Sequence, residues 1–157
     1  MFKLGLLLVA FALAVTACGS DDDTGSETTA AGSGDPVANA CPAEGCEITI
    51  VEASANGDEV EVTWDANFLA DFTRNHIHIY WDNYTADEVS SDAEDRGVTQ
   101  GDWSPTDEYP AYVTESATST ANRGESTILC VTAADRDHVV LDSSIVHCFD
   151  VSAALGG

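Results

Sequence analysis

Polar and apolar side chains alternate along several segments after residue 41, and this pattern predicts β-strands rather than helices. The clearest instances are residues 46–53, 59–64, 75–82, 127–134 and 145–152. Asn56-Gly57-Asp58 supplies turn chemistry between the first two segments, so we expect them to pair as antiparallel strands. The apolar positions Val60, Val62 and Trp64 would then share the buried face of the second strand.

The segment 75–82 carries the most informative alternation. Its apolar face, the expected core face, consists of Ile77, Ile79 and Trp81. The opposite face consists of His76, His78 and Tyr80. The simplest interpretation is that these three are polar residues on a solvent-facing strand.

The long stretch 83–113 lacks a regular alternation. Thr85 followed three residues later by Glu88 is a capping-box pattern, which predicts one or two helical turns ending before Gly97. Farther on, the aromatic residues Trp103, Tyr109 and Tyr112 lie among prolines, where the backbone is stiff. They are a candidate ligand-binding edge, with Trp103 the first choice for an exposed recognition residue. The alternative is that Trp103 folds back and caps an open end of the domain.

Three segments resemble strands B, C and F of a fibronectin type III domain, namely Val62-Thr63-Trp64, the run from Ile77 to Trp81, and residues 128–133 with the Asp-containing loop that follows. The resemblance implies that residues 41–157 form one all-β, immunoglobulin-like sandwich, with a long, part-helical insertion between strands C and E. Two features depart from that family. Thr127 stands where strand F usually begins with tyrosine, and the insertion is longer than usual.

The first 40 residues predict export and a lipid anchor. Residues 1–17 combine Lys3 with an apolar run too short to span a bilayer, which is typical of a signal peptide. The run ends in Val15-Thr16-Ala17-Cys18, which resembles the bacterial lipobox, and this resemblance implies that Cys18 is lipidated. Residues 18–40 are polar and would form a flexible acidic tether. We therefore expect a lipoprotein on the extracytoplasmic face of a membrane, periplasmic or at the cell surface. The alternative is an ordinary secretory signal cleaved near Ala17.

Four further cysteines, Cys41, Cys46, Cys130 and Cys148, are an even number in an expected oxidising compartment, which indicates disulfides. Three connectivities are open. We favour Cys41 with Cys46, because they bracket a turn-like Pro-Ala-Glu-Gly. The remaining pair would join two neighbouring strands. A metal site at these cysteines is disfavoured, because no C-x-x-C pair is present.

The chain is strongly acidic, with a formal net charge of −23. Without residues 1–17 it has 28 carboxylates against four arginines, 4 − 28 = −24. This balance argues against nucleic acid as a partner. It fits adaptation to salt, solubility on a crowded surface, or loose cation binding. One acidic cluster is a weak candidate for calcium and consists of Asp87, Glu88, Asp92, Glu94 and Asp95.

His76 and His78 are the sharpest candidate for chemistry. Side chains two residues apart on a strand emerge on the same face, where two imidazoles can share one metal ion. In the fibronectin-like topology, the loop between the last two strands lies at the same end as the start of strand C. This places His138, with Asp135 and Asp137, near His76 and predicts a zinc or copper site.

The fourth histidine, His147, is not expected to join that site. If Leu129, Val131 and Ala133 point inward, Cys130 points outward, and a Cys130–Cys148 bond turns His147 toward the core. The sequence has no G-x-S-x-G elbow, no H-E-x-x-H motif, no phosphate-binding glycine loop and no C-x-x-C redox pair. An enzyme is therefore the least favoured function, and no cofactor is required. We expect a non-catalytic module that binds an envelope protein, peptide or glycan. The alternative is that the domain binds a metal ion, either zinc, copper or calcium.

Overall fold

The computed structural model describes residues 41–156. The predicted signal peptide (1–17), the lipidated Cys18 and the tether (18–40) lie outside the described residues and stay predictions. Across residues 41–156, no helix is long and apolar enough to cross a membrane.

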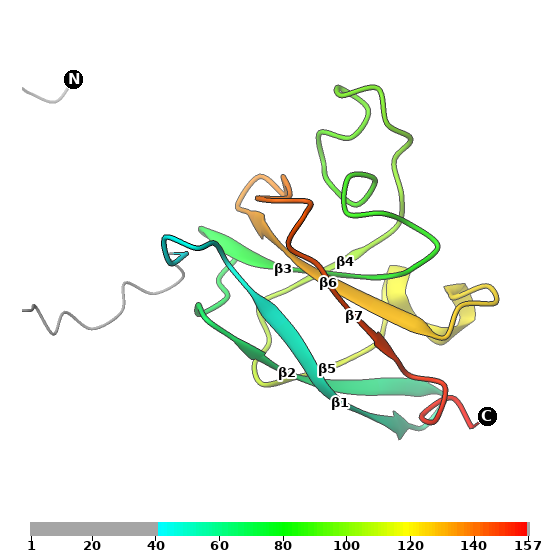
Figure 1. Cartoon of the computed structure of the whole chain (residues 1–157). Helices are drawn as coiled ribbons and strands as arrows, with labels where there is room; N and C mark the ends of the chain where they lie inside the picture. Colours follow the sequence, from blue (N-terminus) through cyan, green and yellow to red (C-terminus); the bar gives the residue numbers. More distant parts are fainter. Residues whose placement is uncertain (1–40, 157) are drawn as a thin grey trace, which may run out of the picture. The chain divides into compact units, whose positions relative to one another are not determined.

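The described chain is all-β and forms two antiparallel sheets, as the alternation predicts (Figure 1). The three-stranded sheet has the order β1 (Ile48–Asn56), β2 (Glu59–Ala66) and β5 (Ala111–Val113). The four-stranded sheet has the order β4 (Ser104–Thr106), β3 (Asn75–Trp81), β6 (Ile128–Asp135) and β7 (His147–Asp150). Two 3-10 turns, η1 (Ser116–Thr118) and η2 (Thr120–Asn122), precede β6. The five predicted strands correspond to β1, β2, β3, β6 and β7.

The inner faces of the two sheets form one hydrophobic core. From β2 the core receives Val60, Val62 and Trp64, and from β3 it receives Ile77, Ile79 and Trp81. From β6 it receives Leu129, Val131 and Ala133. All nine side chains are buried, so the inward faces predicted for these strands are confirmed. Burial of such aliphatic and aromatic side chains stabilises a domain by about 1.5–3 kcal/mol each, before conformational entropy is subtracted.

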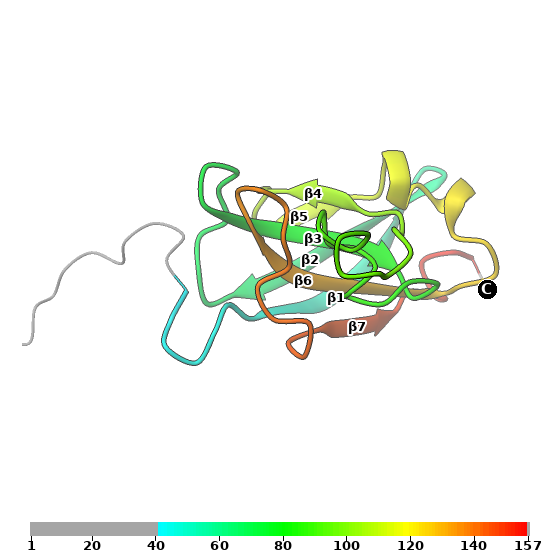
Figure 2. The same cartoon turned by 90° about the horizontal axis from the view of Figure 1, so that it is seen from above.

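The outer face of the four-stranded sheet is buried along its two central strands, β3 and β6, which corrects the prediction of a solvent-facing strand. His76 and His78 are 0% exposed and Tyr80 is 1% exposed. The segment between β3 and β4 and the loop between β6 and β7 lie over this face (Figures 1 and 2). Tyr80, Val89 and Cys130 form a second apolar cluster there. Both faces of β3 are therefore covered.

The segment between β3 and β4 consists of turns, not the predicted helix. Thr85 and Glu88 do form half of the expected capping box, because the Glu88 carboxylate accepts hydrogen bonds from the backbone N–H and hydroxyl of Thr85. One helical hydrogen bond follows, from Val89 N–H to Thr85 C=O at 3.2 Å. The chain then turns again at Ser90 instead of continuing. These turns bring Val89 down onto the sheet.

Both favoured disulfides are confirmed. Cys41 is bonded to Cys46, and Cys130 to Cys148. The second bond joins directly opposed residues of β6 and β7. It closes the part of the chain that contains His138.

Candidate metal centre

Three imidazoles, those of His76, His78 and His138, converge on the covered face of the four-stranded sheet. His76 and His78 are two residues apart on β3, so both project from the same face. His138 approaches from the loop between β6 and β7. His138 Nδ1 lies 2.9 Å from His76 Nε2 and 3.4 Å from His78 Nε2. One nitrogen from each residue lies within 4.8 Å of the other two.

The loop that carries His138 is fixed by local hydrogen bonds. The Asp135 carboxylate accepts from the backbone N–H groups of Asp137 and Val139, each at 2.9 Å. His138 has φ of 64°, in the left-handed region that few non-glycine residues adopt. Its carbonyl accepts a hydrogen bond from Ser91 N–H at 2.9 Å. The loop and the segment over the sheet therefore hold His138 between them.

His78 has a defined tautomer. Its Nδ1 lies 2.7 Å from the carbonyl oxygen of Val89, to which Nδ1–H donates. In the neutral ring this leaves a lone pair on Nε2, the nitrogen that faces His138. A backbone carbonyl behind the second ring nitrogen is the arrangement that orients metal-binding histidines in proteins.

The environment of His76 is more apolar. The ring of Phe72 lies 5.0 Å from it, and its Nδ1 is buried without a hydrogen-bond partner. Its Nε2 is directed at His138. The ring is therefore held by packing on one side and by His138 on the other.

His76 and His78 are electrically neutral at physiological pH. Burial, reinforced by the nearby His138 and opposed by Asp135, lowers the pKa of His76 to about 4. Burial also lowers the pKa of His78 to about 3, although the bond to Val89 favours the charged form. Metal ions bind the neutral imidazole, so few protons compete for these two rings above pH 6.

Trp103 forms part of the wall of this cluster. Its ring stacks on His78 with the centroids 5.0 Å apart, and its Nε1 is buried without a partner. Trp103 is therefore not the freely exposed recognition residue that we expected first. It also does not cap an open end of the domain, which was the alternative. Of the other two aromatic residues, Tyr109 is 55% exposed, whereas Tyr112 is 3% exposed and stacks on Trp64 in the core. Tyr112 is therefore unavailable as a surface-binding ring.

The acidic residues suggested as ligands do not belong to the group that the three histidines form. Asp137 is 72% exposed and faces Arg136, while Asp135 is occupied by the loop. In the candidate calcium cluster, Asp87 and Asp92 both pair with Arg96. Glu88 bonds to Thr85, and Glu94 and Asp95 are exposed. Within residues 41–156, the three histidines alone form a group with metal-binding spacing.

His147 lies away from the cluster, as the strand argument predicts. Its half-buried ring accepts a hydrogen bond from Ile50 N–H through Nδ1, at 3.1 Å. It therefore bridges β7 to β1 of the other sheet.

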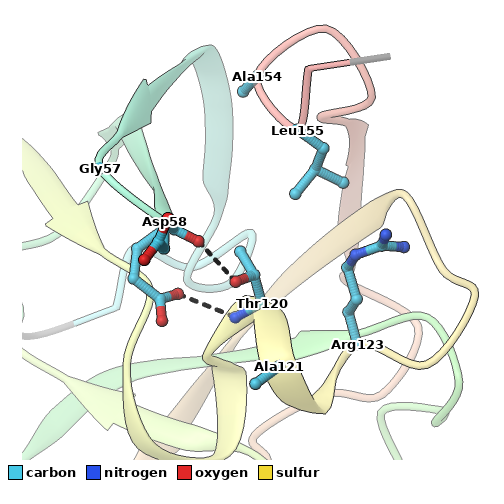
Figure 3. A pocket seen from close by; sticks show the side chains of 8 residues that line it. Gly57, Asp58, Thr120, Ala121, Arg123, Ala154 and Leu155 are labelled. Carbon is cyan, nitrogen blue, oxygen red and sulfur yellow. Dashed lines mark hydrogen bonds between the residues drawn. The ribbon is translucent and has the colours of Figure 1, made fainter.

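A separate polar depression lies at the other end of the sandwich, beside the β1–β2 turn, and includes Asp58, Glu59, Thr120 and Arg123 (Figure 3). The Glu59 carboxylate accepts hydrogen bonds from the hydroxyls of Ser119 and Thr114 and from Thr120 N–H. Burial opposes ionisation of Glu59, but these bonds outweigh it and lower the pKa. Because the protein itself supplies hydrogen-bond donors to this carboxylate, we interpret Glu59 as a structural residue that holds the segment around Thr120 against β2.

Replacement of Glu59 with glutamine should reduce the free energy of unfolding by about 1–3 kcal/mol, because the new amide group faces hydrogen-bond donors. Urea unfolding of the 41–157 domain measures this change. Glu52→Gln is the matched control, since Glu52 is exposed on β1. Equal stability of the Glu59→Gln and Glu52→Gln variants would contradict the structural role.

Two features of the centre were not found from the sequence. The carbonyl of Val89 behind His78 carries no side-chain signal. The contact of Phe72 with His76 comes from an irregular loop. Tyr80 and the outward-pointing Cys130 were a usable signal, because apolar residues beside two histidines indicate a covered face.

No family model, curated protein or solved structure matches this chain.

Proposed function

We propose that this chain is an extracytoplasmic, lipid-anchored protein whose β-sandwich binds one transition-metal ion, zinc or copper, through His76, His78 and His138. The observation that carries the proposal is the convergence of one nitrogen from each ring within 4.8 Å. It is supported by the carbonyl of Val89, which leaves His78 Nε2 free to bind.

The spacing suits a metal ion. Zinc binds imidazole nitrogen at about 2.0–2.1 Å, so two ligands of a tetrahedral ion lie about 3.3 Å apart. Two of the three separations, 2.9 and 3.4 Å, lie on either side of that value, and the third is within 4.8 Å. Small rotations of the rings would therefore admit an ion.

The donor set favours some metals over others. Three neutral imidazoles suit zinc, copper and nickel, and divalent copper usually binds such sites most tightly. Calcium and magnesium require oxygen ligands, which this group lacks. All four cysteines of the described chain are in disulfides, so no thiolate among them competes for the metal.

We also propose that the sandwich is of the fibronectin type III-like kind. In support, the strand after β3 pairs with β3 itself, and β7 pairs with β6, which gives sheets of three and four strands. The proposed location rests on the lipobox-like sequence at Cys18, and the two disulfides fit an oxidising compartment. Partner binding through the loop from Trp103 to Tyr112 has less support, because Tyr109 alone of its three aromatic residues is an exposed ring.

The test is metal-dependent thermal stability of the 41–157 domain with zinc, copper and calcium, combined with equilibrium dialysis. We expect one equivalent of zinc or copper to bind. An excess of one hundred times the dissociation constant should stabilise the fold by about 2.7 kcal/mol. The variants His76→Ala with His78→Ala, and His138→Ala alone, should lose this shift, and His147→Ala should keep it. A shift with calcium alone, or an unchanged shift in the His138→Ala variant, would contradict the proposal.

A further inference from the structure

A shallow depression adjoins the histidine cluster. It is lined by Gln100, Gly101, Asp102, Trp103, Pro105 and His138, with a volume of about 370 Å³. That volume falls within the range of small-ligand pockets, about 300–1,000 Å³. His138 belongs to both the cluster and the depression, and Trp103 lies against His78 while lining the depression. A molecule seated there is therefore next to the metal centre.

The protein supplies three ligands to the proposed ion. Zinc and copper commonly take a fourth, and a site with three protein ligands leaves that position open to water or another molecule. No fourth histidine, cysteine or carboxylate of residues 41–156 belongs to the group. The covering segment closes over His76 and His78, whereas His138 is only half buried at the edge of the depression.

The lining of the depression favours a particular class of ligand. The indole of Trp103 offers a flat apolar surface, on which another ring can stack. Asp102 is exposed, and its Oδ2 accepts a hydrogen bond from the hydroxyl of Tyr84 at 3.0 Å. Its Oδ1 can therefore accept a hydrogen bond from a bound molecule. With a net charge of −23, the chain disfavours anions. These features together suit a neutral aromatic ring with one metal-binding nitrogen and one N–H group.

We propose that the metal centre takes an external imidazole, the side chain of a histidine in a partner peptide, as its fourth ligand in the depression beside Trp103. The imidazole binds the ion through one nitrogen and donates its other N–H toward Asp102. Carboxylates commonly play this part behind metal-bound histidines. This inference rests on the proposed metal-binding function.

The test uses the copper(II)-loaded 41–157 domain and free imidazole, monitored by electron paramagnetic resonance. The hyperfine pattern should show three nitrogen ligands without imidazole and four with it, while dialysis shows that copper stays bound. Azide should bind more weakly than imidazole. Asp102→Asn should raise the imidazole concentration for half-saturation at least tenfold, and Trp103→Ala should also raise it. Asp107→Asn, an exposed change outside the depression, is the matched control and should leave it unchanged.

Two results separate this inference from the proposal on which it rests. If copper fails to bind at one equivalent, or binds equally well after His76→Ala with His78→Ala, the metal-binding function itself is wrong. If copper binds through the three histidines but the nitrogen count stays at three until imidazole strips the metal, only the external ligand is wrong. If the wild type, Asp102→Asn and Trp103→Ala reached half-saturation at the same imidazole concentration, the proposed binding position in the depression would also be wrong.

Discussion

Lowering the pH of the metal-free domain from 7 to 4.5 is expected to reduce its free energy of unfolding by up to about 5 kcal/mol through His76 and His78. Both rings have lower pKa values in the folded state, about 4 and about 3, than the 6.5 of an unperturbed histidine. The unfolded chain therefore binds more protons than the folded chain below pH 6.5, and stability falls with pH through this window. Each histidine contributes about 1.4 kcal/mol per pH unit.

Urea unfolding at several pH values, with a chelator present, measures this slope. Replacing His76 and His78 together with leucine should remove most of it, because leucine does not titrate. His147→Leu is the control and should retain it. Carboxylates with lowered pKa values, such as Asp142 and Asp150, destabilise the fold mainly below pH 4.5, outside the window. A leucine variant with the wild-type slope would show that the two rings are not buried and neutral.

Removal of the Cys130–Cys148 disulfide, by alanine at both positions, is expected to destabilise the domain by about 3 kcal/mol. The bond joins residues 18 apart in the sequence, and closing a loop of about that length restricts the unfolded chain by this amount. His138 lies within this loop, between β6 and β7. The same change should therefore also weaken metal binding, because His138 is then held less firmly against His76 and His78.

The matched control is removal of the Cys41–Cys46 disulfide, which joins residues only five apart. Its loss should cost about 2 kcal/mol, because a shorter loop restricts the unfolded chain less. Metal affinity should fall much less, since neither cysteine lies in the loop that carries His138, although Cys41 Sγ accepts a hydrogen bond from Asn75, the neighbour of His76. Thermal unfolding and metal titration of both variants measure these effects. An equal loss of metal affinity in the two variants would contradict the role assigned to the β6–β7 loop.

The regular part of the fold was readable from the sequence because strand periodicity sets which side chains meet. The alternation of Ile77, Ile79 and Trp81 predicts an inner face, and the same period places His76 and His78 together. Topology then brings the β6–β7 loop to the start of β3, which correctly predicts that His138 lies beside His76. The pairing of Cys130 with Cys148 follows from the same register.

Strand periodicity could not predict that another segment covers the face of β3 that carries His76 and His78. The segment from Asn83 to Trp103 folds as irregular turns, whose course depends on tertiary contacts and not on a local period. Val89, for example, is an isolated apolar residue in the sequence, yet it is fully buried against Tyr80 and Cys130. Without that contact, His76 and His78 have the pattern of exposed polar residues. Strands as short as β4 and β5, of three residues each, also lack a detectable alternation.

A crystal structure of the 41–157 domain grown with zinc or copper, with anomalous diffraction measured at the absorption edge of the metal, tests the central claim most directly. We predict a single strong anomalous peak about 2.0–2.1 Å from His76 Nε2, His78 Nε2 and His138 Nδ1. Peaks confined to exposed carboxylates such as Glu94 and Asp95, with none among the three histidines, would contradict the account.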